Sequence, residues 1–106
     1  MLTIIELGED VKSLERMTVI KDISSVQSYK DYLTITASND KTYIYDICLD
    51  LTELTMIQGA MNGASIGIVI CKGREENFYM DNMSGWSNAG FVKRAREVLL
   101  DNDADA

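Results

Sequence analysis

The sequence predicts an α+β fold, with a mostly antiparallel sheet of about five to six strands and two to three helices packed on one face of it. Short apolar or alternating segments, typical of strands, recur along the whole chain. Two longer segments have helical spacing and begin at the helix-capping residues Asp50 and Ser87. The expected order is strand, short helix, three strands, helix, two strands and helix, which favours α+β over a regular βαβ alternation.

The N-terminal part is predicted to contain a strand, a short helix and a second extended segment. Residues 2–7 are mostly apolar and favour a strand. Residues 9–16 place Val11 and Leu14 at helical spacing, with acidic residues first, which suits the helix dipole. Residues 17–23 are rich in β-branched side chains and are therefore expected to be extended.

The clearest local signal is a β-hairpin over residues 32–47. Both arms alternate, and Asn39–Asp40 between them tolerate the positive φ of a two-residue turn. Such a loop places Ile35 opposite Ile44. The core face would then carry Leu33, Ile35, Ala37 and Ile44, and the other face Tyr32, Thr34, Thr36, Tyr43 and Tyr45.

A helix over residues 51–62 follows the hairpin. Asp50 and Glu53 have the spacing of a capping box, in which each side chain accepts a backbone N–H of the other. Gly63 is a natural helix stop. Leu51, Leu54, Ile57 and Met61 form the expected inward stripe of this helix.

The C-terminal part is predicted to contain a central strand, its antiparallel partner and a final helix. Residues 65–71 are almost continuously apolar, as in a strand covered on both faces, and residues 77–80 form the partner. Ser87 caps a helix that ends near Leu100, and residues 101–106 form an acidic tail that frays. Residues 1–100 therefore read as one domain. The helix's inward residues are expected to be Phe91, Ala95, Val98 and Leu99.

Composition excludes several classes of function. The 106 residues include no histidine, which rules out Ser-His-Asp and Cys-His catalysis and zinc sites that need imidazole. Seventeen acidic against ten basic residues give a formal charge of −7, which disfavours direct binding of nucleic acid or an anionic membrane. We expect no metal and no cofactor.

The carboxylates offer no strong catalytic pair. Asp50 and Glu53 are explained by the helix cap, Asp46 lies on a strand, and Glu75 and Glu76 lie together in a turn. None of these sets provides the two dissimilar environments that divide carboxylates into acid and base. The chain is therefore predicted not to be an enzyme.

The N-terminus has neither a basic region nor a long apolar stretch, so we expect no signal peptide and a cytoplasmic location. Cys48 and Cys71 are then expected to be reduced, buried thiols on strands. The uncharged run from Leu54 to Cys71 is interrupted by polar residues and glycines, which argues against a membrane span.

The first candidate site is the tyrosine–threonine face of the hairpin. If this face is open, its side chains form an aromatic, hydrogen-bonding surface suited to a protein partner or a second copy of the chain. Cross-strand tyrosine pairing that only stabilises the sheet is the commoner explanation of the same pattern. The proposed partner-binding residues are Tyr32, Thr34, Thr36, Tyr43 and Tyr45.

The second candidate site joins the loop around the only tryptophan to the basic helix that follows it. Amides at the helix start and nearby cations can bind an anion such as a nucleotide phosphate. A solvated helix face with Trp86 against the sheet edge is the competing explanation. The residues concerned are Trp86, Ser87, Asn88, Lys93, Arg94 and Arg96.

Three functional hypotheses follow. The leading one is a small acidic binding protein, of the phage or mobile-element accessory type, that modulates or inhibits a larger protein, possibly a basic or nucleic-acid-binding one. The second is a binder of a small nucleotide-like anion at the tryptophan loop. The third is a structural subunit that self-associates as a homo-oligomer through strand edges or the tyrosine face.

Overall fold

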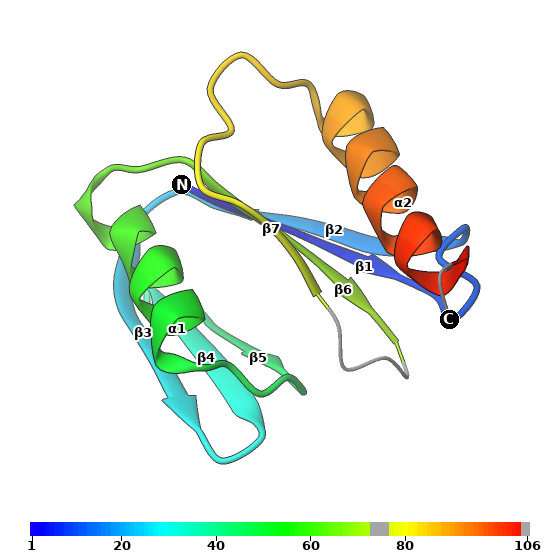
Figure 1. Ribbon diagram of the computed structural model, residues 1–106. Coiled ribbons are helices and arrows are strands. Elements are labelled where there is room, and N and C mark those ends of the chain that lie inside the picture. The colour runs from blue at the N-terminus through cyan, green and yellow to red at the C-terminus, as the bar shows by residue number, and fades with distance from the viewer. Residues whose placement is uncertain (73–76, 105–106) are drawn as a thin grey trace.

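Two adjacent parallel strands, β1 (Leu2–Leu7) and β6 (Ile66–Cys71), form the centre of a four-stranded sheet. The computed structural model describes residues 1–72 and 77–104, and within them the strand order of this sheet is β2–β1–β6–β7. In the described part of the chain, each central strand is therefore paired on both sides (Figure 1).

The outer strands of this sheet both run antiparallel to their neighbours. β2 (Leu14–Ile20) pairs with β1, and β7 (Asn77–Met80) pairs with β6. The predicted strands at residues 2–7 and 77–80 are confirmed, and the strand predicted at 65–71 is central, as expected.

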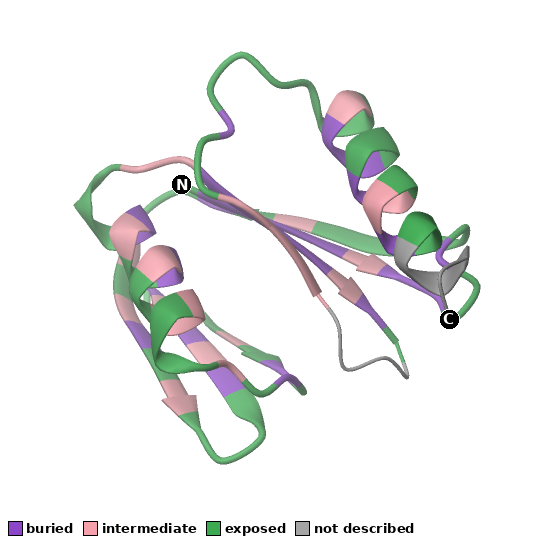
Figure 2. Cartoon of the chain, viewed as in Figure 1, coloured by how far each residue is buried: buried purple, intermediate pink, exposed green. Residues whose placement is uncertain are grey.

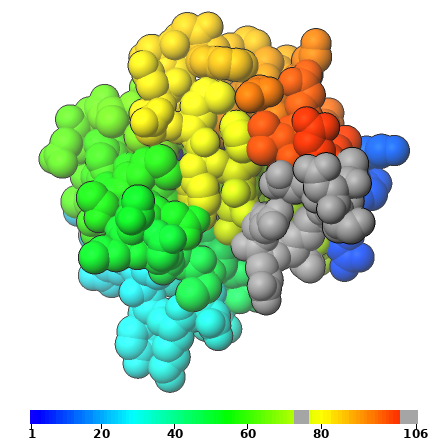
Figure 3. Space-filling view, in the orientation of Figure 1, coloured from blue at the N-terminus to red at the C-terminus, as the bar shows by residue number. Residues whose placement is uncertain are grey.

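A second sheet contains three strands in the order β3–β4–β5. They are β3 (Ile23–Tyr29), β4 (Tyr32–Ala37) and β5 (Thr42–Tyr45), and each runs antiparallel to the next. Only Lys21 and Asp22 separate β2 from β3, so the chain passes directly from one sheet into the other. The turn between β3 and β4 projects from the body of the molecule (Figure 3).

The two helices occupy different parts of the fold. α1 (Leu51–Gln58) continues as a 3₁₀ turn, η1 (Gly59–Asn62), and packs on β3, while α2 (Asn88–Ala104) lies over the four-stranded sheet (Figure 1). The start of α2 at Ser87 is confirmed, because the Ser87 Oγ accepts the Gly90 N–H at 3.0 Å. The helix extends beyond the predicted end near Leu100.

Alternation along β1 directs its side chains into two separate cores. Leu2 and Ile4 join the second sheet and α1 in one core, whereas Ile5 and Leu7 pack under α2 with Phe91 in the other. At Gly67, a Cβ atom would lie 2.7 Å from the Phe91 Cζ, so glycine is what lets α2 approach the sheet. Buried residues accordingly run along β1 and β6, while β2 is mostly exposed (Figure 2).

The expectation of one sheet with helices on one face is therefore only partly correct. The class is α+β, but the described residues form two sheets with seven strands, and the four-stranded sheet is covered by α2 on one face and by the second sheet with α1 on the other. Local patterns predict strands well, whereas the assignment of strands to sheets depends on long-range pairing.

The predicted helix at residues 9–16 is wrong. Residues 8–13 form the tight connection between β1 and β2, and Leu14 already begins β2. Val11 has a φ of 65°, and the Asp10 carboxylate accepts the Lys12 and Ser13 N–H groups at 3.0 and 3.1 Å. Side-chain hydrogen bonding of this kind competes with a helix, and pairing with β1 decides the outcome.

The predicted hairpin is confirmed, but its register differs by one residue. The Asp40 N–H donates to the Ala37 carbonyl, and the Ala37 N–H donates to the Lys41 carbonyl. With Asp40 at a φ of 68°, the loop has one residue more than expected, and Ile35 therefore lies opposite Tyr43. A shift of one residue reverses the faces of the following strand, so Ile44 is exposed and Tyr45 is buried.

The capping box at the start of α1 is confirmed and also connects this helix to the four-stranded sheet. The Asp50 carboxylate accepts the Glu53 N–H at 2.7 Å, and the Glu53 carboxylate accepts the Asp50 N–H at 3.2 Å. The Tyr79 hydroxyl of β7 also donates to the Glu53 carboxylate. In the space-filling view, α1 (green) accordingly lies against the yellow segment that contains β7 (Figure 3).

The predicted inward stripe of α1 is only partly correct. Ile57 is buried and Leu54 is half-buried, whereas Leu51 and Met61 are exposed. The α-helix gives way to the 3₁₀ turn at Gly59, and this change of helical twist takes Met61 out of line with the residues before it.

The contact between Glu53 and Tyr79 predicts a stability change at high pH. Burial and the hydrogen bond to Glu53 raise the pKa of Tyr79 above the usual value near 10, so the neutral hydroxyl is favoured in the folded state. Its contribution is complete below about pH 10 and is lost as the pH rises through the folded-state pKa. Tyr79→Phe should cost about 1 kcal/mol at neutral pH and should flatten the loss of stability above about pH 10.

Urea unfolding at neutral pH and at a series of alkaline pH values measures this effect. Tyr32→Phe is the matched control, because the side chain of Tyr32 is half exposed at the start of β4. Equal pH profiles for the wild type and Tyr79→Phe would contradict the assigned role of the Glu53–Tyr79 contact.

Candidate functional site

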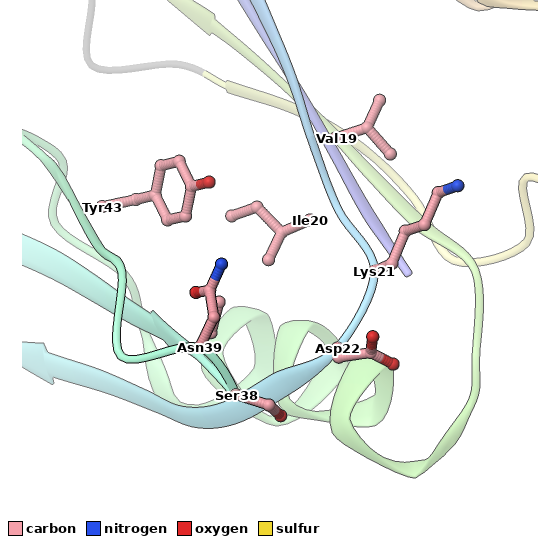
Figure 4. Close-up of a pocket in the computed structure, with 8 residues that line it drawn as sticks. Val19, Ile20, Lys21, Asp22, Ser38, Asn39 and Tyr43 are labelled. Atoms are coloured by element: carbon pink, nitrogen blue, oxygen red, sulfur yellow. The ribbon is translucent and has the colours of Figure 1, made fainter.

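The candidate site lies where the outer strands of the two sheets face each other. In the described part of the chain, β2 is at the edge of one sheet and β5 is at the edge of the other. Tyr45 of β5 forms a side-chain hydrogen bond with Thr18 of β2. Farther along, Tyr43 and Ile20 point toward each other across a pocket (Figure 4). The two strands therefore run in opposite directions along a shared seam.

Three hollows follow this seam, and together we call them the seam cleft. The middle hollow, of about 430 Å³, lies between Arg16–Thr18 of β2 and Lys41–Tyr45 at β5. The lower hollow, of about 450 Å³, lies beyond Tyr43, between Val19–Asp22 and Ala37–Asn39. Each is within the range of small ligand pockets.

The upper hollow, of about 310 Å³, continues the cleft beyond Tyr45. It is lined by the end of β1, by Tyr45–Ile47 and by the end of β6, including Cys71. Tyr45 lines both the upper and the middle hollow, and Tyr43 lines both the middle and the lower hollow. The two tyrosines thus lie between three successive hollows along the seam.

The lower hollow is closed at its base by the backbone. The Ser38 N–H donates to the Asp22 carbonyl at 2.9 Å, which fixes the hairpin turn to the connection between the sheets. Val19 and Lys21 point away from Tyr43, toward the other face of β2, so Ile20 is the residue of β2 that faces the tyrosine (Figure 4). This closure sets one end of the cleft.

Acidic and basic side chains line different hollows of the cleft. Glu6, Glu15 and Asp46 line the upper hollow together with one cation, Lys72. The middle hollow is lined instead by Arg16 and Lys41, and its described lining contains no acidic residue. A net charge of −7 spread over the chain makes this local pair of cations distinctive.

Arg16 and Lys41 make only weak contacts with other side chains of the protein. The Arg16 Nε lies 3.6 Å from the Glu6 Oε2, but that buried oxygen accepts no hydrogen bond, and the Arg16 side chain is 72% exposed. The Lys41 Nζ lies 5.1 Å from the centre of the Tyr43 ring, a cation–π distance that leaves its N–H donors available.

Burial sets the state of the tyrosine between the upper and middle hollows. Removal from water raises the pKa of the Tyr45 hydroxyl above its usual value near 10, which further favours the neutral form. Tyr45 therefore acts as a neutral hydrogen-bonding wall between the acidic and the basic compartment.

The structure divides the predicted tyrosine–threonine face. Tyr43 and Tyr45 turn inward to the seam cleft, whereas Tyr32, Thr34 and Thr36 lie on the outer face of the hairpin, where Ile44 joins them. The assumption that all five form one surface is wrong, because the register of β5 is shifted by one residue. A binding role for either group stays a prediction.

The predicted anion site is not assembled as expected. Trp86 is about half exposed beside the start of α2, and Asn88 is the first residue of that helix. At 1.5 Å per residue, Arg96 lies roughly 12 Å farther along the helix axis. There its guanidinium donates to the carbonyls of Val11 and Lys12, and so supports the turn between β1 and β2.

The other cations of α2 do not converge on Trp86 either. Arg94 forms an exposed ion pair with Glu97 at 3.6 Å, and Lys93 is exposed. Ser87 is engaged as the helix cap. Anion binding by Trp86, Ser87, Asn88, Lys93, Arg94 and Arg96 stays a prediction.

The predictions for the two cysteines and for the paired glutamates have different outcomes. Cys71 is buried, as expected, but Cys48 is exposed in the connection before α1, so the expectation of two buried thiols is wrong. Glu75 and Glu76 lie outside the described residues.

Local sequence patterns do not reveal the residues that give the cleft its charges. Arg16 fits the end of a predicted helix, and Glu6, Glu15 and Lys41 fit ordinary surface positions. One available signal is the spacing of Lys41, Tyr43 and Tyr45, which places alternate residues on the same side of a strand.

Comparisons with protein-family models, curated proteins and solved structures found no match to this chain. None of the described helices is long and apolar enough to cross a membrane. Function must therefore be inferred from the geometry of the site itself.

The observed register predicts opposite effects for two neighbouring residues of β5. Ile44 is 65% exposed and Tyr45 is 6% exposed. Ile44→Thr should therefore change the free energy of unfolding by less than about 0.5 kcal/mol. Tyr45→Ala should cost about 3 kcal/mol, because it leaves a cavity in the core. Urea denaturation of both variants measures the difference, and a larger cost at Ile44 would contradict the register.

Proposed function

We propose that this chain is a non-enzymatic binding protein that holds an extended segment of a larger protein in the seam cleft. The observation that carries this proposal is the pair of strand edges, β2 and β5, that face each other across an elongated cleft. Edge strands present backbone N–H and C=O groups that an added strand can pair with.

The side chains of the cleft suit a peptide better than a compact ligand. Tyrosines placed at intervals provide apolar area and hydrogen-bonding groups, a combination enriched at protein interfaces. Met17 and Ile44, whose side chains lie on the outer sides of their strands, add exposed apolar surface beside the middle hollow. The seven residues of β2 correspond to roughly 23 Å of strand, enough for a segment of similar length.

A non-enzymatic role is consistent with the chemistry of the chain. It has no histidine, and the carboxylates of Asp50 and Glu53 are engaged in the helix cap. A binding protein of this kind can modulate or inhibit its partner by occupying a segment that the partner needs in extended form.

Self-association is a second candidate, and it is favoured by exposed apolar residues on the same edge strand. Leu14, Met17 and Val19 of β2 are 54%, 46% and 39% exposed. Pairing of β2 with β2 of a second copy would cover them. Sedimentation at increasing concentration distinguishes a monomer with an open cleft from a dimer in which this edge is covered.

Selection from a displayed library of random peptides tests the leading proposal. We expect the wild type to enrich a family of related sequences. Thr18→Trp should abolish this enrichment, because Thr18 lines the middle hollow and its side chain faces Tyr45 across the seam, so an indole there would fill the hollow.

Thr34→Trp is the matched control, because Thr34 is likewise a half-buried strand threonine but lies on the outer face of the hairpin, away from the residues that line the three hollows. Enrichment that survives Thr18→Trp would place binding outside the cleft. No enriched sequence with any folded protein would contradict the proposed function itself.

A further inference from the structure

Resting on the proposed function, the separation of charge in the seam cleft specifies the partner segment. We propose that the cleft takes an extended peptide segment that carries one basic and one acidic side chain, the basic one in the upper hollow and the acidic one in the middle hollow. The proposed function requires only that an extended segment binds, whereas this proposal specifies the charges that the segment carries.

The upper hollow has the properties of a site for a lysine or arginine side chain. Glu6, Glu15 and Asp46 line it against one cation, Lys72, and the buried Glu6 Oε2 has an ion-pair partner in Arg16 at 3.6 Å but accepts no hydrogen bond within the described protein. A buried carboxylate oxygen without a donor is costly, and an incoming ammonium or guanidinium group would supply one. Because Glu15 and Asp46 are exposed, this compartment is open to such a side chain.

The middle hollow has the opposite preference. Arg16 and Lys41 are its charged residues, and both are exposed. Lys41 is held near the cleft through the ring of Tyr43, while its N–H groups can still donate. An aspartate or glutamate of the segment would accept from both cations, whereas a basic side chain placed here would be repelled.

The tyrosine between the two hollows sets the spacing. Alternate side chains of a strand lie on the same face, with a separation of roughly 6.6 Å between residues i and i+2. The basic and the acidic residue should therefore be about two or four positions apart, so that they enter the two hollows on either side of Tyr45.

The same charges disfavour a nucleic acid as the occupant. A single strand places a phosphate at every nucleotide, and the carboxylates of the upper hollow would repel the phosphates that follow those bound by Arg16 and Lys41. The facing strand edges also offer backbone pairing to a peptide that a nucleic acid cannot use.

Synthetic peptides that match the sequences enriched in the selection test this inference. We expect those sequences to contain the basic–acidic pair at constant spacing. Replacement of the acidic residue by lysine, or of the basic residue by glutamate, should weaken binding to the wild type by about tenfold or more, measured by fluorescence anisotropy.

Two charge-reversed proteins assign each side chain to its hollow. Arg16→Glu with Lys41→Glu should restore binding of the peptide whose acidic residue is replaced by lysine. Glu15→Lys with Asp46→Lys should restore the peptide whose basic residue is replaced by glutamate. All four positions are exposed, and urea unfolding checks that the fold survives the loss of the Arg16–Glu6 ion pair in the first protein. Lys30→Glu with Lys93→Glu, also at exposed positions, is the matched control and should restore neither peptide.

The outcomes separate the two proposals. Enriched peptides that depend on Thr18 but lack the charge pair, or that tolerate both replacements, would overturn this inference and leave the proposed function in place. Competition between the peptides and a phosphate-bearing oligothymidylate through Arg16 and Lys41 would overturn the inference in the same way. Absence of any enriched peptide would overturn the proposed function as well.

Discussion

The parallel pairing of β1 with β6 is the constraint on which the rest of the structure depends. Parallel neighbours require a long crossover connection, and here that connection contains β2 to β5, α1 and η1. Because both faces of the central pair are apolar, both must be covered. α2 covers one face. The crossover covers the other, and it does so as a sheet with its own helix.

The seam cleft is a consequence of this arrangement. The chain leaves the first sheet at Ile20 and enters the second at Ile23, and the hydrogen bond between Tyr45 and Thr18 places the far edge strand, β5, beside β2. Tyr45 reaches Thr18 across the seam and Tyr43 faces Ile20, with a hollow on either side of each tyrosine. Tyr43 and Tyr45 therefore pack between the two sheets and also line the cleft. Binding in the cleft consequently depends on the position of β5.

Local signals predict most of the elements but not their assembly. The cap formed by Asp50 and Glu53 and the hairpin arms depend on neighbouring residues, and both are predictable. The helix expected around Val11 does not form, because pairing with β1 and hydrogen bonding by Arg96 stabilise a turn there. The charged cleft could not be predicted at all, since Arg16 and Lys41 meet only when two distant strands face each other. One additional loop residue decides the placement of the tyrosines.

The central claim is that β2 and β5 have open edges along the cleft. Amide hydrogen exchange of the protein without a ligand, followed residue by residue by NMR, tests it most directly. Edge strands pair on one side only, so about half of the β2 amides should exchange rapidly, in an alternating pattern, while the amides of β1 and β4 stay protected. Uniform protection of β2 and β5, as strong as that of β1, would show that the edges are already paired, and would contradict the account.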